Sequence, residues 1–89
     1  MKYSVEYLPQ VVKTLEKMDK FTKRIIVEWI EKNLVDTDNP RIHGKPLSAD
    51  RSGQWRYRVG DYRIIALIQD NKLVILVISI GHRREVYKK

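Results

Sequence analysis

The sequence predicts a single α+β domain, in which a helical hairpin packs on a mainly antiparallel four-stranded sheet in the order β-α-α-β-β-β. The chain has 89 residues, 43% of them hydrophobic and 33% charged, a composition that suits one small core. Apolar side chains recur at helical spacing in residues 9–34, whereas they alternate with polar ones in residues 2–7 and 55–59. We therefore treat residues 1–89 as one domain.

Residues 2–7 are expected to form the first strand, because apolar and polar side chains alternate along them. Pro9 follows closely, and proline is favoured in the first turn of a helix. The helix that begins there carries an apolar stripe made of Val11, Val12, Leu15 and Met18. Asp19 and Lys20 interrupt the stripe, so the first helix is expected to end before them.

A second helix is expected to follow, with Thr22 as its N-cap. Its apolar stripe consists of Ile25, Ile26, Trp29, Ile30 and Leu34. Two helices joined by so short a turn form a helical hairpin. Both stripes are assigned to the core and not to a ligand site.

The remainder of the chain is expected to contain a loop and three strands. Residues 35–52 are rich in Asp, Asn, Pro, Gly and Ser, which predicts a loop. Strands are then expected at residues 55–59, 62–68 and 73–80, joined by turns at Gly60-Asp61 and Asp70-Asn71.

Charge is the most informative feature of the composition. The chain has 18 basic and 11 acidic residues, a formal net charge of +7. Residues 1–40 hold seven of each sign, so the whole excess lies in residues 41–89, which contain seven arginines. The planar guanidinium group suits phosphate, whereas lysine is the more usual solubilising charge. An arginine-rich half therefore favours a polyanionic ligand over a merely soluble basic surface.

Composition also excludes several classes of protein and of binding site. Cysteine is absent, which removes disulfides and thiolate ligands, and the two histidines stand 39 positions apart. The longest apolar run, residues 73–78, is far too short to cross a bilayer, and the N-terminus lacks a signal-peptide core. We expect a cytoplasmic protein with no metal, no cofactor and no membrane association.

The turn at residues 60–61 sets the register of its hairpin, so that Arg58 is predicted to lie opposite Arg63. Cross-strand partners project to the same side of the sheet. Arg56, Arg58 and Arg63 therefore share one face. The other face is expected to carry Trp55, Tyr57, Val59, Tyr62 and Ile64.

Like charges directly opposite each other destabilise a sheet by a few tenths to about 1 kcal/mol. This predicts that an anion binds beside Arg58 and Arg63. The alternative is a solvated face on which each arginine pairs with a carboxylate. Asp61 is the only close acidic candidate, which favours the anion site.

A second turn at residues 70–71 is expected to place Arg63 opposite Ile78 and to let the chain leave the sheet at residues 80–81. The residues then expected beside the arginine face are His82, Arg83, Arg84 and Tyr87. The alternative for residues 82–89 is a frayed basic tail.

One more feature concerns a protein partner. The arginine side of the sheet is also expected to carry Ile65, Leu67, Val74, Leu76 and Ile78. Residues 35–54 are one candidate cover for this apolar surface, and a segment of a partner protein is the other. The sequence leaves both open.

These side chains suit the metal-free transesterification of RNA. Arginine is a poor base but stabilises the extra negative charge of a phosphorane. RNA supplies its own nucleophile, the 2′-hydroxyl, which needs only to be oriented in line with the phosphate. In this set His82 offers an imidazole, the usual acid–base group of proteins, and Tyr87 offers a phenolic proton. DNA lacks the 2′-hydroxyl and fits the set poorly.

Three segments carry a family resemblance: residues 43–47 (His-Gly-Lys-Pro-Leu), 55–65 (Trp-Arg-Tyr-Arg-Val-Gly-Asp-Tyr-Arg-Ile-Ile) and 81–87 (Gly-His-Arg-Arg-Glu-Val-Tyr). Together with the β-α-α-β-β-β order, they make nearly the whole chain resemble the RelE/ParE superfamily of bacterial toxin–antitoxin systems. The resemblance implies a RelE-like toxin that enters the ribosomal A site and cuts mRNA there without a metal. It also implies a cognate antitoxin, whose acidic segment wraps the toxin.

The resemblance also assigns roles. Arg63 corresponds to the strand arginine that contacts the scissile phosphate, Arg83 to the arginine that stabilises the transition state, and Tyr87 to the C-terminal aromatic that stacks on a base or aids proton transfer. Arg56 and Arg58 stand where the best-known RelE members carry two lysines, one of them a proposed general base. This departure leaves the proton acceptor open.

A C-terminal histidine serves in a related branch of the family, which makes His82 a candidate for that role. The residues expected to be catalytic are Arg58, Arg63, His82, Arg83 and Tyr87, and those expected to bind RNA phosphates are Lys45, Arg56 and Arg84. One alternative is a ParE-like toxin that inhibits DNA gyrase and cuts nothing. Another is a degenerate toxin that binds only its antitoxin and operator. The presence of Arg83 and Tyr87 together favours the RelE branch.

Overall fold

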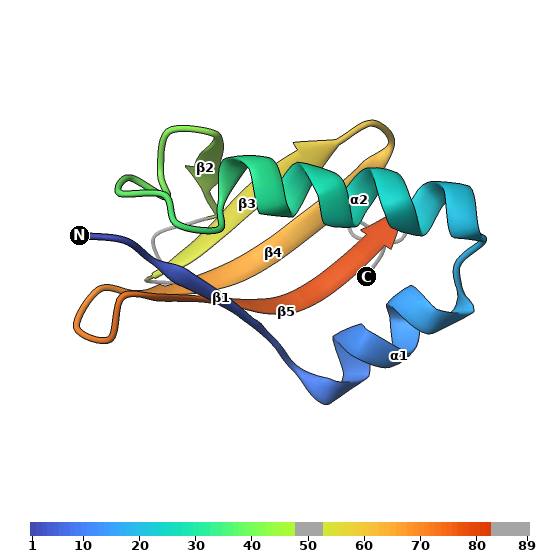
Figure 1. The fold of residues 1–89 in the computed structure, drawn as a ribbon, viewed down its shortest axis with the longest axis horizontal. Coiled ribbons are helices and arrows are strands. Elements are labelled where there is room, and N and C mark those ends of the chain that lie inside the picture. Colours follow the sequence, from blue (N-terminus) through green and yellow to red (C-terminus); the bar gives the residue numbers. More distant parts are fainter. Residues whose placement is uncertain (48–52, 83–89) are drawn as a thin grey trace.

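The computed structural model describes residues 1–47 and 53–82, while residues 48–52 and 83–89 lie outside the described part (Figure 1). Its elements, in chain order, are β1 (Ser4–Tyr7), α1 (Pro9–Lys17), α2 (Lys20–Asn33), β2 (Gly44–Pro46), β3 (Gln54–Val59), β4 (Tyr62–Gln69) and β5 (Val74–His82).

A five-stranded sheet forms the centre of the fold, in the order β1-β5-β4-β3-β2. β1 runs parallel to β5, and the other neighbours are antiparallel. Figure 1 shows α2 lying across the sheet, with α1 beside β5. The predicted α+β class and the β-α-α-β-β-β order are confirmed, with one additional short strand.

That strand is β2, which lies in the segment that the sequence predicts as loop. Lys45 pairs with Arg56, and Gly44 pairs with Tyr57. A Cβ atom on Gly44 would lie 2.6 Å from Cδ1 of Trp55 and 2.8 Å from Cδ1 of Tyr57. Glycine is therefore needed for this close approach. A three-residue strand is too short to show a period of two, so the sequence pattern misses it.

The helices begin close to the predicted positions, but the cap of α2 differs. The N-cap is Asp19, whose carboxylate accepts hydrogen bonds from the Thr22 backbone N–H (3.0 Å) and from Thr22 Oγ1 (2.7 Å). The hydrogen bonds from Thr22 lower the pKa of Asp19. Thr22 thus lies in the first turn as a donor to the cap, and the prediction that it is the N-cap itself is wrong. The two residues cap the helix together.

The core lies between the helices and one face of the sheet. Its fully or nearly fully buried members are Tyr3, Val11, Leu15, Ile26, Ile30, Leu34, Tyr57, Val59, Ile64, Ala66, Ile68, Ile75, Val77 and Ile80. Val12 and Ile25, predicted as part of the apolar stripes, are 41% and 44% exposed and lie outside the core. Each immediately precedes or follows a buried residue, and successive side chains on a helix point about 100° apart.

The turn between β4 and β5 is longer than predicted. Gln69 pairs with Val74, so the turn holds the four residues 70–73 instead of two. Leu73 closes it in the left-handed region, at φ 56°. A leucine is rare in this conformation, so no sequence pattern signals the longer turn.

A register shift in the same pair moves the end of β5. The shift lies between Ile65 and Ala66, which pair with Ser79 and Val77 and thus leave Ile78 as the extra residue. Consequently, the residue opposite Arg63 is Gly81, and the predicted pairing of Arg63 with Ile78 is wrong. β5 continues to His82 and does not end at residues 80–81.

The sheet face opposite the core carries a mixed surface. Ile65 and Leu67 share this face with the arginines, as predicted, and Leu67 pairs with Leu76. Ile65, Leu67 and Leu76 are all partly exposed. Occupation of this face by a partner segment stays a prediction.

Candidate functional site

The β3–β4 hairpin presents its arginines on the face of the sheet that turns away from the core. The predicted register is confirmed, because Arg58 pairs with Arg63. The adjacent side chains of Tyr57 and Ile64 are fully buried in the core. Since side chains alternate along a strand, Arg56, Arg58 and Arg63 share the other face.

A pocket of ≈ 280 Å³ lies over this face. It is lined by Ile42, His43, Gly44, Lys45, Arg56, Arg58 and Arg63. Its size is close to the lower end of ligand-binding pockets, which start at roughly 300 Å³. None of these lining residues is acidic, so the pocket suits a small anionic group such as a phosphate.

The cations of the pocket differ in exposure. Arg63 is only 8% exposed, whereas Arg58 and Lys45 are exposed and Arg56 is partly exposed. A guanidinium group stays charged even when it is buried. The pocket thus combines one buried cation with others that are more open to solvent.

Pairing of β2 with β3 brings Lys45 to the pocket, since Lys45 lies directly opposite Arg56. Four of the predicted site residues are therefore brought together: Lys45, Arg56, Arg58 and Arg63. Their mutual repulsion raises the free energy of the empty pocket, and a bound anion reverses that effect.

His43 also lines the pocket, although the sequence analysis assigns it no role. It directly precedes β2, and its imidazole ring meets Trp29 of α2 edge-on, with ring centroids 6.2 Å apart at 78°. Sequence patterns treat this region as loop, so they do not bring His43 to the arginines. The available signal is its position two residues before Lys45 in the family-like segment 43–47.

His82 lies elsewhere. It pairs with Tyr62, and the two rings meet edge-on with centroids 5.5 Å apart. Tyr62 precedes Arg63 in β4, so Tyr62 and His82 share the face opposite the arginines. The expectation that His82 joins the arginine patch is therefore wrong, because the register shift in β5 places Gly81 opposite Arg63 instead.

Arg83, Arg84 and Tyr87, the other residues assigned to the site, lie outside the described residues.

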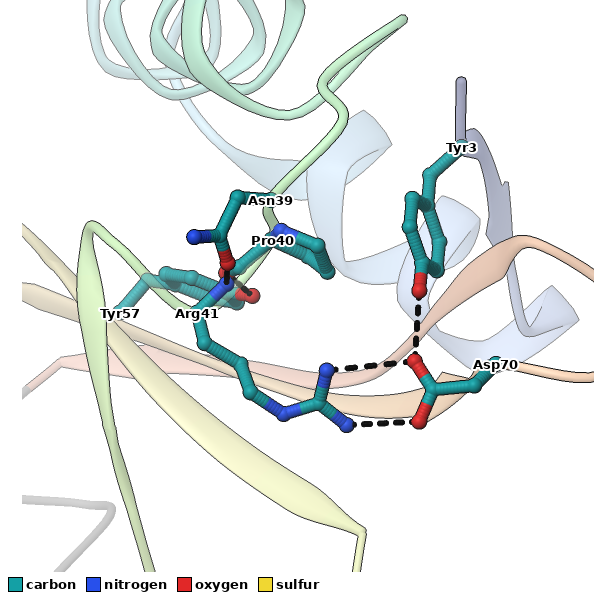
Figure 2. A network of polar contacts seen from close by, with 6 residues as sticks. All are labelled: Tyr3, Asn39, Pro40, Arg41, Tyr57 and Asp70. Carbon is teal, nitrogen blue, oxygen red and sulfur yellow. Dashed lines mark hydrogen bonds and ion pairs between the residues drawn. The ribbon is translucent and has the colours of Figure 1, made fainter. Parts of the chain in front are cut away.

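An ionic cluster ties down the segment that leads into β2 (Figure 2). Arg41 Nη1 and Nη2 donate to Asp70 Oδ1 and Oδ2 over 3.2 and 2.9 Å, and the Tyr3 hydroxyl donates to the same Oδ1 over 2.6 Å. The hydrogen bonds from Arg41, followed by that from Tyr3, lower the pKa of Asp70. The cluster joins the residues before β1, the segment before β2 and the β4–β5 turn.

A second contact holds the same segment from inside. The hydroxyl of Tyr57 donates to the carbonyl oxygen of Pro40 over 2.6 Å, and both residues are buried. Burial raises the pKa of Tyr57, so its hydroxyl stays protonated as the donor. Arg41 follows Pro40 directly, and its backbone N–H donates to Asn39 Oδ1 over 3.2 Å. The backbone at Pro40 and Arg41, which leads to the pocket wall, is thus held by Tyr57 from the core and by Asp70 at the surface.

The described part of the chain contains neither a metal-binding cluster nor a membrane-spanning helix. Among residues 1–47 and 53–82, no three His, Asp or Glu side chains come together as a metal site. No helix in the described part of the chain is long and apolar enough to cross a membrane.

Solved structures share this fold. The toxin–antitoxin complex RelBE2 from Mycobacterium tuberculosis contains a chain that is 25% identical, with a TM-score of 0.81 and coverage of 93% of both chains. A free arginine-to-alanine variant of the Escherichia coli toxin RelE superposes with a TM-score of 0.77 at 23% identity, covering 98% of this chain and 92% of that chain. The fold is therefore that of small RelE-type toxins.

Sequence comparison agrees with this class. Toxin RelG of M. tuberculosis (strain ATCC 25618 / H37Rv) is 26% identical over 89 residues, which cover 100% of both chains. Toxin RelE of the same strain is 29% identical over 86 residues, which cover 97% of this chain and 87% of that protein. The family model described as the ParE toxin of the type II toxin–antitoxin system parDE matches residues 5–87. The chain belongs to this family, the RelE/ParE superfamily of type II toxins.

Proposed function

We propose that the protein is a ribosome-dependent endoribonuclease, which inhibits translation by cutting mRNA in the A-site codon through attack of the RNA 2′-hydroxyl on the adjacent phosphate. The pocket supports this, because its cations surround a space of ≈ 280 Å³ with no acidic lining residue. The nucleophile belongs to the substrate, so the protein has to orient the phosphate and stabilise the extra charge of the transition state.

The proposed roles follow the arrangement of the pocket. Arg58 and Arg63 contact the scissile phosphate, and Lys45 and Arg56 bind neighbouring phosphates. Arg84 is proposed to bind phosphate as well, while Arg83 stabilises the transition state and Tyr87 stacks on a base or assists proton transfer. The assignments of Arg83 and Tyr87 rest on the family resemblance, and that of Arg84 rests on its place in the arginine-rich segment beside them. His82 is left out of the set because it faces Tyr62.

A protein partner belongs to the same proposal. Two similar solved structures are described as toxin–antitoxin complexes, RelBE2 of M. tuberculosis and RelBE of E. coli. We expect this chain to act in the cytoplasm and to be neutralised by a cognate antitoxin with an acidic segment. A net charge of +7 favours such a partner.

Inhibition of DNA gyrase is the second candidate function. The observation that favours it is the matching family model, whose description names the ParE toxin. In that case the chain would bind a protein surface and leave RNA intact. The arginine pocket would then have no substrate to cut.

The test is primer extension on mRNA in purified translating ribosomes, with the wild-type protein, Arg58→Gln and Arg83→Ala. We expect cuts within the A-site codon that are lost or strongly reduced in both variants. Arg24→Gln is the matched control, because Arg24 is 71% exposed on α2 and pairs with Glu28 away from the pocket. Intact mRNA together with inhibited supercoiling by purified gyrase would favour the second candidate.

A further inference from the structure

We propose that His43 is the proton-transferring residue of the pocket, and that it accepts the proton of the RNA 2′-hydroxyl. The inference rests on the proposed endoribonuclease function and adds the base that the arginines do not supply. Arginine stays protonated at physiological pH, so Arg56, Arg58 and Arg63 are suited to charge stabilisation only. Histidine is the side chain whose ordinary titration range includes neutrality.

The pairing of β2 with β3 brings the residues that follow His43 beside the arginines. Gly44 pairs with Tyr57 and Lys45 with Arg56. His43 directly precedes Gly44, and the lining of the pocket contains both His43 and Arg58. The charged groups around His43 in the pocket are thus Lys45 from β2, Arg56 and Arg58 from β3 and Arg63 from β4.

Packing holds the imidazole in place while leaving it accessible. The ring of Trp29 on α2 meets the His43 ring edge-on, with the two ring centroids 6.2 Å apart. The Trp29 ring in turn lies 5.8 Å from the ring of the fully buried Tyr57. His43 itself is exposed. An exposed histidine that lines the pocket and whose ring is held by Trp29 suits a residue that has to exchange protons with substrate and water.

The backbone on both sides of His43 is also restrained. Gly44 lies so close to the Trp55 and Tyr57 rings that a Cβ atom would come within 3 Å of each. Upstream, the Pro40 carbonyl accepts the Tyr57 hydroxyl and Arg41 is bound to Asp70. These contacts hold the segment that carries His43 in place, although most of that segment is loop.

The proposed step balances as follows. A neutral imidazole nitrogen takes the 2′-hydroxyl proton while the 2′-oxygen forms a bond to phosphorus. The bond from phosphorus to the 5′-oxygen breaks, which leaves a 2′,3′-cyclic phosphate, and the 5′-oxygen takes a proton from water. The imidazolium then returns its proton to solvent. The surrounding guanidinium groups stabilise the additional negative charge on phosphorus during the step.

The chain provides its own matched control, because it has two histidines and they lie at separate places in the fold. His43 lines the pocket, whereas His82 lies against Tyr62. The experiment compares wild type, His43→Gln and His82→Gln by single-turnover cleavage of ribosome-bound mRNA between pH 5.5 and 8.5. Sedimentation with ribosomes measures binding, and thermal unfolding checks the fold.

We expect His43→Gln to lower the cleavage rate by about 100-fold or more, which is the range of general base catalysis. The variant should also lose the acidic limb of the pH–rate profile, that is, the fall of the cleavage rate at low pH. Ribosome binding by His43→Gln should stay within about twofold of wild type. His82→Gln should keep both the wild-type cleavage rate and the acidic limb of its pH–rate profile. A His43→Gln rate within about threefold of wild type, or an unchanged limb, overturns the inference alone. A wild-type protein that cuts nothing overturns the proposed function and the role of His43 with it.

A measurement on the unaltered protein covers the case in which His43→Gln unfolds. The two imidazole rings give separate NMR signals, and the probe is a 2′-O-methyl trinucleotide, which cannot be cut. Its addition should shift the signals of His43 and leave those of His82 in place. Signals of His43 that do not move at saturating trinucleotide contradict the inference.

Discussion

Arg58 and Arg63 face each other across the β3–β4 hairpin, and both line the same pocket. Arg63 is 8% exposed, whereas Arg58 is open to solvent. Two like charges in directly opposed positions weaken a hairpin. The pair therefore supports the proposed anion site, because the pairing of like charges does not itself favour stability.

Removal of the charge at Arg58 should therefore stabilise the empty protein. We expect Arg58→Gln to raise the free energy of unfolding by a few tenths to about 1 kcal/mol at low salt, with a smaller gain at high salt. Urea unfolding at two ionic strengths measures this. Arg58→Lys keeps the charge and should change little. A variant less stable than wild type at both ionic strengths would contradict the repulsion.

The Arg41–Asp70 ion pair predicts a pH dependence of stability. The pKa of Asp70 is lower in the folded chain, where Arg41 and Tyr3 donate to it, than in the unfolded chain, where it is about 3.9. The contribution is therefore present above the unfolded pKa and is lost as the pH falls through the folded pKa. The side chains are 39% and 57% exposed, so about 1 kcal/mol is an upper limit.

The variant that isolates this pair is Asp70→Asn, compared with wild type in urea at pH 7 and pH 3. The two proteins should differ at pH 7, and the difference should be smaller at pH 3. Equal stability at pH 7 means that the pair contributes nothing measurable. A difference of the same size at both pH values assigns the effect to packing or to the amide and not to charge.

The hydrogen bond between Tyr57 and Pro40 is buried and should matter more. We expect Tyr57→Phe to lower the free energy of unfolding by about 1–3 kcal/mol, because the Pro40 carbonyl loses its partner inside the core. The raised pKa of Tyr57 means that this contribution is present below the unfolded pKa of about 10 and declines as the pH rises above it. Wild type should therefore lose stability more steeply than Tyr57→Phe above pH 10.

Gly44 is expected to tolerate no side chain. In Gly44→Ala the new Cβ atom would lie 2.5 Å from the carbonyl oxygen of Arg56 and 2.6 Å from the Trp55 ring. We expect a loss of about 1–3 kcal/mol from overpacking, together with displacement of β2 and lower cleavage.

Gly60→Ala is the matched control for that substitution. No atom lies within 4 Å of its Cβ position, and φ is 60°, so it should cost about 1–2 kcal/mol of backbone strain. Cleavage should survive in Gly60→Ala and fall in Gly44→Ala. Equal cleavage in both variants would contradict a role of β2 in shaping the pocket. Thermal unfolding together with the ribosome assay separates the two effects.

Local patterns were sufficient for the hairpin that carries the arginines. A two-residue turn at residues 60–61 leaves one register, and alternation along the strands then places Arg58 and Arg63 on the same face. The helical stripes were equally informative about which elements form, although Val12 and Ile25 proved exposed. In each case the information lies within a few neighbouring residues.

The positions of the two histidines needed contacts between distant segments. His43 reaches the pocket through the pairing of β2 with β3 and the support of Trp29. His82 lies on the other face from Arg63 because the one-residue shift at Ile78 changes the side on which the later side chains of β5 project.

Composition, alternation and turn chemistry thus specify the fold class and the arginine face, since each depends on local backbone geometry. The segment that forms the pocket wall is held by a glycine that fits between two rings and by the ion pair of Arg41 with Asp70. Such features arise from packing between segments that are distant in sequence, and packing energies have no local sequence pattern. For that reason the place of His43 in the pocket lining became recognisable only when the strands were in place.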